Sequence, residues 1–221
     1  MSLAEHVHSD VSAVDPSMVS VSRRLQEDGA SVENFDAVVA EVPIAMSFNS
    51  ISYAVMMATP CDLDDFIRGF AVGEGIVDSA RAIFDIDIEF GDVGVAVNAT
   101  VSNETAHRLK SRRRSMAGPS GCGLCGIESI EHMTRDILPL HATNLPSHAA
   151  LDRALSDMRH KQVVSQSTSG AHAAVWCDMD GNIVSLREDV GRHNALDKLI
   201  GWHSLKPADG FVLVSSRASY E

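Results

Sequence analysis

Four stretches of the first half of the chain are rich in apolar and β-branched residues, and in residues 83–90 these alternate with polar ones, a pattern typical of strands. Residues 37–49 (AVVAEVPIAMSFN) and 51–59 (ISYAVMMAT) predict two paired strands. Residues 83–90 (IFDIDIEF) and 93–101 (VGVAVNATV) predict two more, and the Gly-Asp pair between them is typical of a hairpin turn. We therefore expect two strand pairs in this half.

The period changes to that of a helix between these pairs. In residues 62–77 (DLDDFIRGFAVGEGIV), Asp62 is placed to cap a helix, and the apolar residues of LDDFIRGF fall on one face. Together with the strands, this helix predicts a small N-terminal α+β domain over residues 34–110. Residues 1–33 are polar, acidic and without a period, which predicts a disordered or loosely attached tail.

Helical and strand patterns continue in the second half. Residues 127–138 and 145–162 predict two helices, and the apolar positions of residues 191–202 predict a third. Residues 171–189 predict two strands joined by a Met-Asp-Gly-Asn turn. Residues 130–221 are therefore predicted to form an α/β domain.

The last apolar run, residues 211–214, predicts a parallel strand that leads through Ser215 and Ser216 into another helix. Free backbone N–H groups at such a turn commonly bind an anion, so Arg217 is a candidate ligand. A helix that only begins here would leave a sheet uncovered. We therefore expect the natural fold to continue beyond Glu221, and this domain to be truncated at its C-terminus.

Charge and composition limit the partners and the location that we expect for this protein. The chain has 221 residues, is 45% hydrophobic and carries a net charge of −12, so it is expected to repel nucleic acid and anionic membranes. Its start has neither a cationic segment nor an apolar run, and no window reaches membrane-spanning length. We therefore expect a soluble cytoplasmic protein.

The most unusual stretch is AGPSGCGLCGI (residues 117–127), which carries Cys122 and Cys125 among four glycines. Such glycine density disfavours a helix or strand, so residues 111–129 are predicted to be a basic linker and a mobile CxxC loop. The arginines at 112–114 either attract an anion and favour thiolate at the neighbouring cysteines, or form a solvated face.

Two alternatives to thiol chemistry bear on the cysteines. The CxxC pair is half of a tetrahedral zinc set, but a second CxxC is absent and the deaminase pattern with Pro before the first cysteine is not met, because residue 121 is Gly. We expect no metal site. Cys61 and Cys177 stand alone and are interpreted as small buried hydrophobes.

Polar residues crowd the start of the helix predicted over residues 191–202. Arg192 and His193 would face an anion together with the positive end of the helix dipole. Asp189 and Asn194 are suitable caps. Four further polar residues lie close by in the sequence or precede a neighbouring strand. Glu188 and Asp197 could equally hold the side chains of Arg192 and His193 in place, and Lys198 is another polar group. His172 is either a buried residue or a member of the site.

Five blocks in order resemble the formate dehydrogenase accessory sulfurtransferase family (FdhD). REDVGRHNALDKLIG is similar to its signature block and GCGLCG to its paired-cysteine motif. EVPIAMSFN with MMATPCDLDDFIRGFAVGEGIV, STSGAHAAV and SSRASYE resemble the remaining blocks. The resemblance covers roughly residues 39–221.

The resemblance implies an enzyme that relays sulfur. Members take persulfide sulfur from a cysteine desulfurase onto a loop cysteine and pass it to the molybdenum (or tungsten) bis(molybdopterin guanine dinucleotide) cofactor of formate dehydrogenase. It implies Cys122 as the carrier, with Cys125 assisting or resolving, and Arg192, His193, Asn194 and Arg217 as cofactor-binding residues. It also implies a homodimer with a cytidine-deaminase-like three-layer α/β/α sandwich beside the smaller N-terminal domain.

Two differences from the family pattern concern binding of the molybdenum cofactor, which accepts the sulfur. Ser169-Gly170 stands where the family has Gly-Gly, and Ser216 stands where it has Gly before Arg217. Members also continue into a further segment that contributes to cofactor binding. A second hypothesis, from another class of function, is a non-catalytic chaperone that binds the molybdenum cofactor and hands it to formate dehydrogenase.

Overall fold

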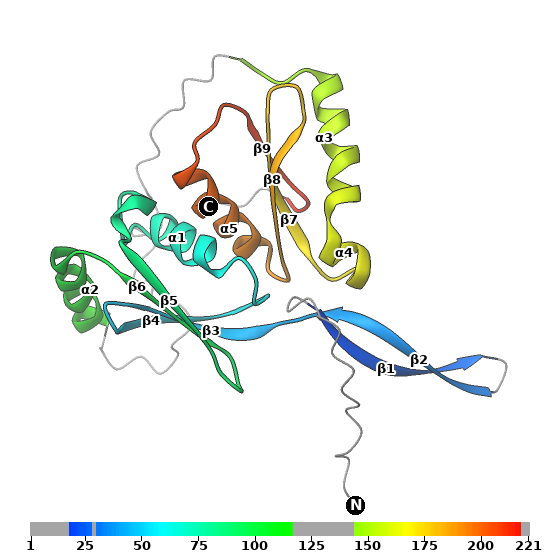
Figure 1. Ribbon diagram of the computed structural model, residues 1–221, viewed down its shortest axis with the longest axis horizontal. Helices are drawn as coiled ribbons and strands as arrows, with labels where there is room; N and C mark the ends of the chain where they lie inside the picture. Colours follow the sequence, from blue (N-terminus) through cyan, green and yellow to red (C-terminus); the bar gives the residue numbers. More distant parts are fainter. Residues whose placement is uncertain (1–17, 28–29, 117–143, 218–221) are drawn as a thin grey trace, which may run out of the picture.

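The computed structural model describes residues 18–27, 30–116 and 144–217 (Figure 1). Their elements are, in order, β1 (Met18–Glu27), β2 (Ala30–Val39), β3 (Val42–Phe48), β4 (Ile51–Ala58), α1 (Leu63–Gly73), the 3₁₀ helix η1 (Ala80–Ala82), β5 (Asp85–Phe90), β6 (Val95–Thr100), α2 (Asn103–Met116), α3 (His148–Lys161), α4 (Val163–Thr168), β7 (His172–Cys177), β8 (Ile183–Asp189), α5 (Arg192–Leu205) and β9 (Phe211–Val214). The expected helix over residues 127–138 lies outside the described residues.

Strand β3 from the first predicted stretch and the strands of the other three form one sheet in the order β4-β3-β6-β5. Both predicted pairs are antiparallel, and the pairs join through parallel β3 and β6. Ile44, Met46 and Phe48 of β3 are buried and pack against α1, as the period of two requires. The strands predicted over residues 51–59, 83–90 and 93–101 and the helix predicted between the strand pairs are confirmed. Helix α2 was not predicted, and its residues 111–116 lie in the stretch expected to be a basic linker.

The second sheet has the order β8-β7-β9 and lies between two layers of helix. Along β7, Ala173, Val175 and Cys177 belong to the cluster with α3, whereas Ala174 and Trp176 pack in the cluster with α5. This alternation buries both faces of the central strand. The α/β class is confirmed, and this part of the chain is a three-layer α/β/α arrangement; the likeness to deaminases stays a prediction.

Two glycines join the halves of the molecule. Helix α1 lies on the four-stranded sheet and α5 on the three-stranded one, and the helices pack against each other between the sheets (Figure 1). A Cβ on Gly69 of α1 would overlap the carbonyl of Asp197, and a Cβ on Gly201 of α5 would overlap the carbonyl of Asp65. The two backbones therefore approach too closely for any side chain at these positions.

Two local expectations from the sequence are corrected. Strand β9 pairs antiparallel with β7, so it is not the parallel strand predicted for residues 211–214. Asp62 precedes α1 in a left-handed conformation (φ 52°), and its side chain makes no capping hydrogen bond. Its carboxylate instead lies 3.6 Å from the guanidinium of Arg187.

A strand also lies within the stretch for which a tail was predicted. Strands β1 and β2 pair over ten residues each and form a hairpin that extends away from both sheets (Figure 1). The sequence pattern predicted a single strand over residues 37–49, but residues 37–39 are the end of β2 and β3 begins at Val42. The pairing of β2 with β1 spans up to 21 positions, so no local pattern reports it. The division into domains stays a prediction.

The helices among the described residues are all too short or too polar to cross a membrane.

The contact between α1 and α5 predicts an unequal effect of two identical substitutions. Gly69→Ala forces a methyl group into the backbone of α5 and should lower the free energy of unfolding by about 1–3 kcal/mol, even though alanine favours a helix. Gly73→Ala, one turn further along α1, places its methyl group 3.4 Å from Asp197 Oδ1, an ordinary contact, and should not destabilise the protein. Urea unfolding of both variants checks this, and equal stabilities would contradict it.

Candidate functional site

Helix α5 begins where the three-stranded sheet ends. Its N-cap residue, Gly191, gives the first turn of the helix no side-chain capping hydrogen bond. Arg192 and His193 are half-buried in this first turn, and Asn194 is buried. The structure therefore places three of the predicted binding residues side by side at the positive end of a 14-residue helix.

A buried ion pair lies directly behind this helix start. Lys198 Nζ is 2.7 Å from Asp189 Oδ2, and both side chains are fully buried. The other oxygen, Asp189 Oδ1, accepts from Gly191 N at 2.8 Å and from Asn194 Nδ2 at 2.9 Å. Asp189 thus holds the turn into α5 rather than capping the helix, and Asn194 bonds back to Asp189 with its amide nitrogen.

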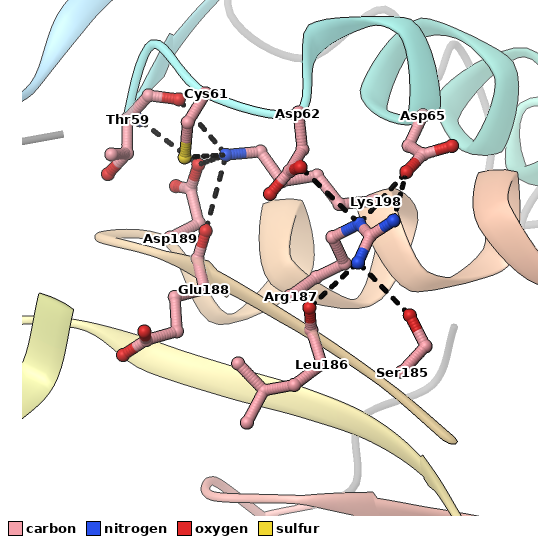
Figure 2. Close-up of polar contacts among 10 residues, drawn as sticks. All are labelled: Thr59, Cys61, Asp62, Asp65, Ser185, Leu186, Arg187, Glu188, Asp189 and Lys198. Carbon is pink, nitrogen blue, oxygen red and sulfur yellow. Dashed lines mark hydrogen bonds and ion pairs between the residues drawn. The ribbon is translucent and has the colours of Figure 1, made fainter. Parts of the chain in front are cut away.

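Lys198 reaches across to the N-terminal half (Figure 2). Its ammonium donates to Thr59 O at 3.0 Å and to Glu188 O at 3.3 Å, and it lies 3.6 Å from Cys61 Sγ. A buried ammonium needs such acceptors because burial removes the water molecules that would otherwise hydrogen-bond to it. The ion pair therefore ties α5 to the connection between β4 and α1.

Cys61 differs from its predicted role as a simple buried hydrophobe. It is only partly buried, and its sulfur accepts a hydrogen bond from Lys198. Burial raises the pKa of the Cys61 thiol, and the charge of Lys198 opposes this only in part. Cys177 is fully buried as predicted, and burial raises its pKa to about 11. Both thiols stay protonated at neutral pH.

Arg187 forms a second link between the halves, closer to the surface (Figure 2). Its Nε and Nη2 donate to Asp65 Oδ2 at 2.9 and 2.6 Å, and its Nη1 donates to Ser185 Oγ and to Leu186 O. Burial raises the pKa of Asp65, while Arg187 acts to lower it. The guanidinium therefore donates its hydrogen bonds to α1 and to β8, the strand that carries Arg187.

Glu188 binds neither Arg192 nor His193 among the contacts that the structure gives. Its carboxylate accepts from Val164 N at 2.9 Å and from Ser165 N at 2.8 Å, at the start of α4. This oxygen pair satisfies N–H groups that α4 leaves free. These two hydrogen bonds of Glu188 therefore order the short helix beside the sheet.

Strand direction brings Arg217 to the same edge of the sheet as Arg192. His172, half-buried at the start of β7, pairs with Asp189 at the end of β8, and Ala174 pairs with Val214 at the end of β9. The carboxyl ends of β8 and β9 therefore lie at one edge, because both strands are antiparallel to β7. Arg217 is exposed just beyond that edge.

The side chain of Arg192 at this edge has a buried nitrogen that lacks a hydrogen bond to the described residues. Arg192 Nε is inaccessible to solvent and makes no hydrogen bond among the residues that the structure describes. A buried donor without an acceptor costs free energy, and a bound anion would remove that cost. Cys122, Cys125 and the arginine side chains at 112–114 cannot be added to this geometry, because the loop and those side chains lie outside the described part of the chain.

Residues that could hold a metal ion are not grouped in this part of the molecule. Among residues 18–27, 30–116 and 144–217, no three His, Cys, Asp or Glu side chains come together in a group that could hold a metal ion.

Sequence reasoning missed Thr59, which takes part in the contacts between the two halves of the chain, because a threonine before a proline at a strand end is typical of any turn. Nothing local in the sequence distinguishes it.

Comparison with known proteins agrees with the resemblance found in the sequence. A model of the FdhD/NarQ family matches residues 39–221. The chain is 46% identical to a sulfur carrier protein FdhD of Chromobacterium violaceum over 227 residues, which covers 100% of this chain and 82% of the relative. It is 45% identical to that of Variovorax paradoxus over 192 residues, covering 86% and 69%.

A solved structure has the same fold. A protein from Desulfotalea psychrophila, assigned to the formate dehydrogenase accessory proteins, aligns with a TM-score of 0.67 at 22% identity. The alignment covers 91% of this chain and 75% of that one.

The buried ion pair predicts a large loss of stability when its cation is removed. Lys198→Met leaves the Asp189 carboxylate buried without its counter-charge, which should lower the free energy of unfolding by about 3–5 kcal/mol. The matched control is Lys161→Met at the exposed end of α3, which should change it by no more than about 0.5 kcal/mol. Urea unfolding measures both, and similar values for the two variants would refute a role for the pair in joining the halves.

Proposed function

The chain belongs to the FdhD/NarQ family, and we propose that it carries sulfur for the maturation of formate dehydrogenase. The names of its relatives support sulfur transfer, and the GCGLCG loop supplies two thiols in a segment suited to reaching more than one partner. The raised pKa values of Cys61 and Cys177 make those thiols poor nucleophiles, which favours the loop pair as carriers.

The donor in this proposal is a cysteine desulfurase that carries a persulfide. The thiolate of Cys122 attacks the terminal sulfur of that persulfide. A bond forms between Cys122 Sγ and this sulfur, the S–S bond of the donor breaks, and the donor cysteine leaves as a thiolate. Cys122 then carries the sulfur as its own persulfide.

Delivery can use the second cysteine. The thiolate of Cys125 attacks Cys122 Sγ, the bond to the terminal sulfur breaks, and that sulfur leaves as hydrosulfide for the acceptor. The product is a Cys122–Cys125 disulfide, which a dithiol reductant resets while becoming a disulfide itself. In the alternative route, Cys125 only assists and the sulfur passes directly from Cys122.

The proposed acceptor is the bis(molybdopterin guanine dinucleotide) cofactor with molybdenum or tungsten, which is a substrate of the transfer. It is strongly anionic, and the edge of the three-stranded sheet fits such a ligand: Arg192 Nε is buried without an acceptor among the described residues, and it lies in the first turn of α5, at the positive end of the helix dipole. Arg192, His193 and Arg217 would hold phosphate or guanine. Asn194 has its amide nitrogen committed to Met57 O and Asp189.

The partners in this account are the desulfurase, formate dehydrogenase and a second copy of the chain, and we place the reaction in the cytoplasm. A non-catalytic chaperone that binds the same cofactor is the alternative. The orphaned Arg192 Nε agrees with either function, because both require the cofactor to bind. The loop cysteines separate them.

A persulfide on the loop is the direct test of sulfur transfer. After incubation with a cysteine desulfurase and cysteine, the intact mass should show one added sulfur, and Cys122→Ala should abolish it because the accepting thiolate is gone. Cys177→Ala is the control, since its buried thiol cannot attack, and it should keep the adduct.

The same variants distinguish carrier from chaperone in cells. Cys122→Ala should abolish formate dehydrogenase activity, whereas Cys177→Ala should retain it. Normal maturation by Cys122→Ala would favour the chaperone, and the absence of a sulfur adduct on the wild-type protein would rule out the carrier.

A further inference from the structure

Thr59 is a fully buried residue between β4 and α1, and each of its three polar atoms bonds to β8, to α5 or to the turn that joins them. Its N–H donates to Asp189 Oδ2 at 3.0 Å, and its carbonyl accepts from Lys198 Nζ at 3.0 Å. Its hydroxyl Oγ1 accepts from Val190 N at 3.1 Å. The polar groups of Thr59 are therefore directed at the other half of the chain.

The same helix start is bound on its other side. Asn194 Nδ2 donates to Met57 O at 2.9 Å, and Gly191 N donates to Asp189 Oδ1 at 2.8 Å. Residues on both sides of Arg192 and His193 are therefore attached, directly or through Asp189, to residues 57–59 of the N-terminal half. The anion-facing turn is built between the two halves, not by the three-stranded sheet alone.

Only one of these contacts depends on the type of side chain at position 59. The backbone N–H and carbonyl of residue 59 are present with any residue, and valine would fill the same volume as threonine. The hydroxyl, however, is the acceptor that the structure gives for the N–H of Val190, two residues before Arg192. Without it, that N–H would be left without an acceptor.

We propose that Thr59 is a positioning residue for the acceptor site: its hydroxyl fixes the turn at Val190 and Gly191, and thereby the place of Arg192 at the start of α5. This rests on the proposed role of Arg192 in binding the anionic cofactor. It makes the acceptor site dependent on the docking of the N-terminal half, although no residue of that half need touch the ligand.

Two substitutions separate the hydroxyl from the shape of the side chain. Thr59→Val keeps the volume and removes the acceptor, and Thr59→Ser keeps the acceptor. Ile44→Val is the matched control, since it removes one methylene from a fully buried residue in the four-stranded sheet and costs a comparable amount of stability. Affinity for guanosine diphosphate, a probe with the guanine and diphosphate of the cofactor, and hydrogen exchange of amides 192–196 are measured on each.

Thr59→Val should weaken guanosine diphosphate binding by about fivefold and speed exchange at these amides by a similar factor, the equivalent of one lost hydrogen bond. Thr59→Ser and Ile44→Val should stay near the wild type in both measurements. Recovery in Thr59→Ser, with no effect in Ile44→Val, is the result that a general loss of stability would not give.

Unchanged exchange in Thr59→Val would overturn the proposal, as would faster exchange with unchanged affinity. Faster exchange in Thr59→Val together with no binding by the wild-type protein would support the control of the helix start by Thr59. The absence of guanosine diphosphate binding by the wild-type protein would, however, overturn the acceptor site of the proposed function. Failure of that site and failure of the role of Thr59 therefore give different results.

Discussion

The structure depends on one buried ion pair, Lys198–Asp189, at the point where the two halves of the chain meet. Two charges without water are tolerated only when further hydrogen bonds satisfy them, and here Thr59, Gly191 and Asn194 supply those bonds. Replacing such a pair by apolar residues can leave stability unchanged in other proteins, so its main consequence here is geometric. It fixes which backbone groups of the N-terminal half face the start of α5.

The glycine crossing and the ion pair act together. Gly69 and Gly201 let α1 and α5 approach until their backbones touch, and this approach carries the residues after β4 to within hydrogen-bonding distance of Asp189. A larger residue at either glycine would push these groups apart. In the proposed division of labour, the loop would carry the sulfur and the contacts between the two halves would hold Arg192 in place for the acceptor.

Much of the fold follows from local pattern, because apolar strand runs mark β3 to β6 and a period of 3.6 is visible in α1. The predicted direction of β9 was wrong, since it depends on the partner strand β7 and not on the run of four apolar residues itself. Asp62 was expected to cap α1, but Arg187, more than a hundred residues away, lies near its carboxylate. Thr59 and Cys61 owe their roles to Lys198, and no spacing in the sequence reports a contact across 137 positions or more.

Sequence reasoning was more informative where chemistry is local. Arg192, His193 and Asn194 are neighbours in the chain, so a helix start places them together, and the edge shared by β8 and β9 adds Arg217. Their role in binding the cofactor stays a prediction, as do the roles of Cys122 and Cys125. These roles meet in a single event, the passage of sulfur from the loop to an acceptor held by Arg192.

The most direct measurement is therefore a single-turnover transfer with ³⁵S. Protein loaded by a desulfurase is freed of donor, mixed with the molybdenum guanine dinucleotide cofactor, and the label on protein and cofactor is counted. The account predicts that label moves from the wild-type chain and from Arg153→Ala, an exposed charge change on α3, but stays on Arg192→Ala, which loads normally. Label that remains on the wild-type protein, or leaves Arg192→Ala equally fast, would contradict it.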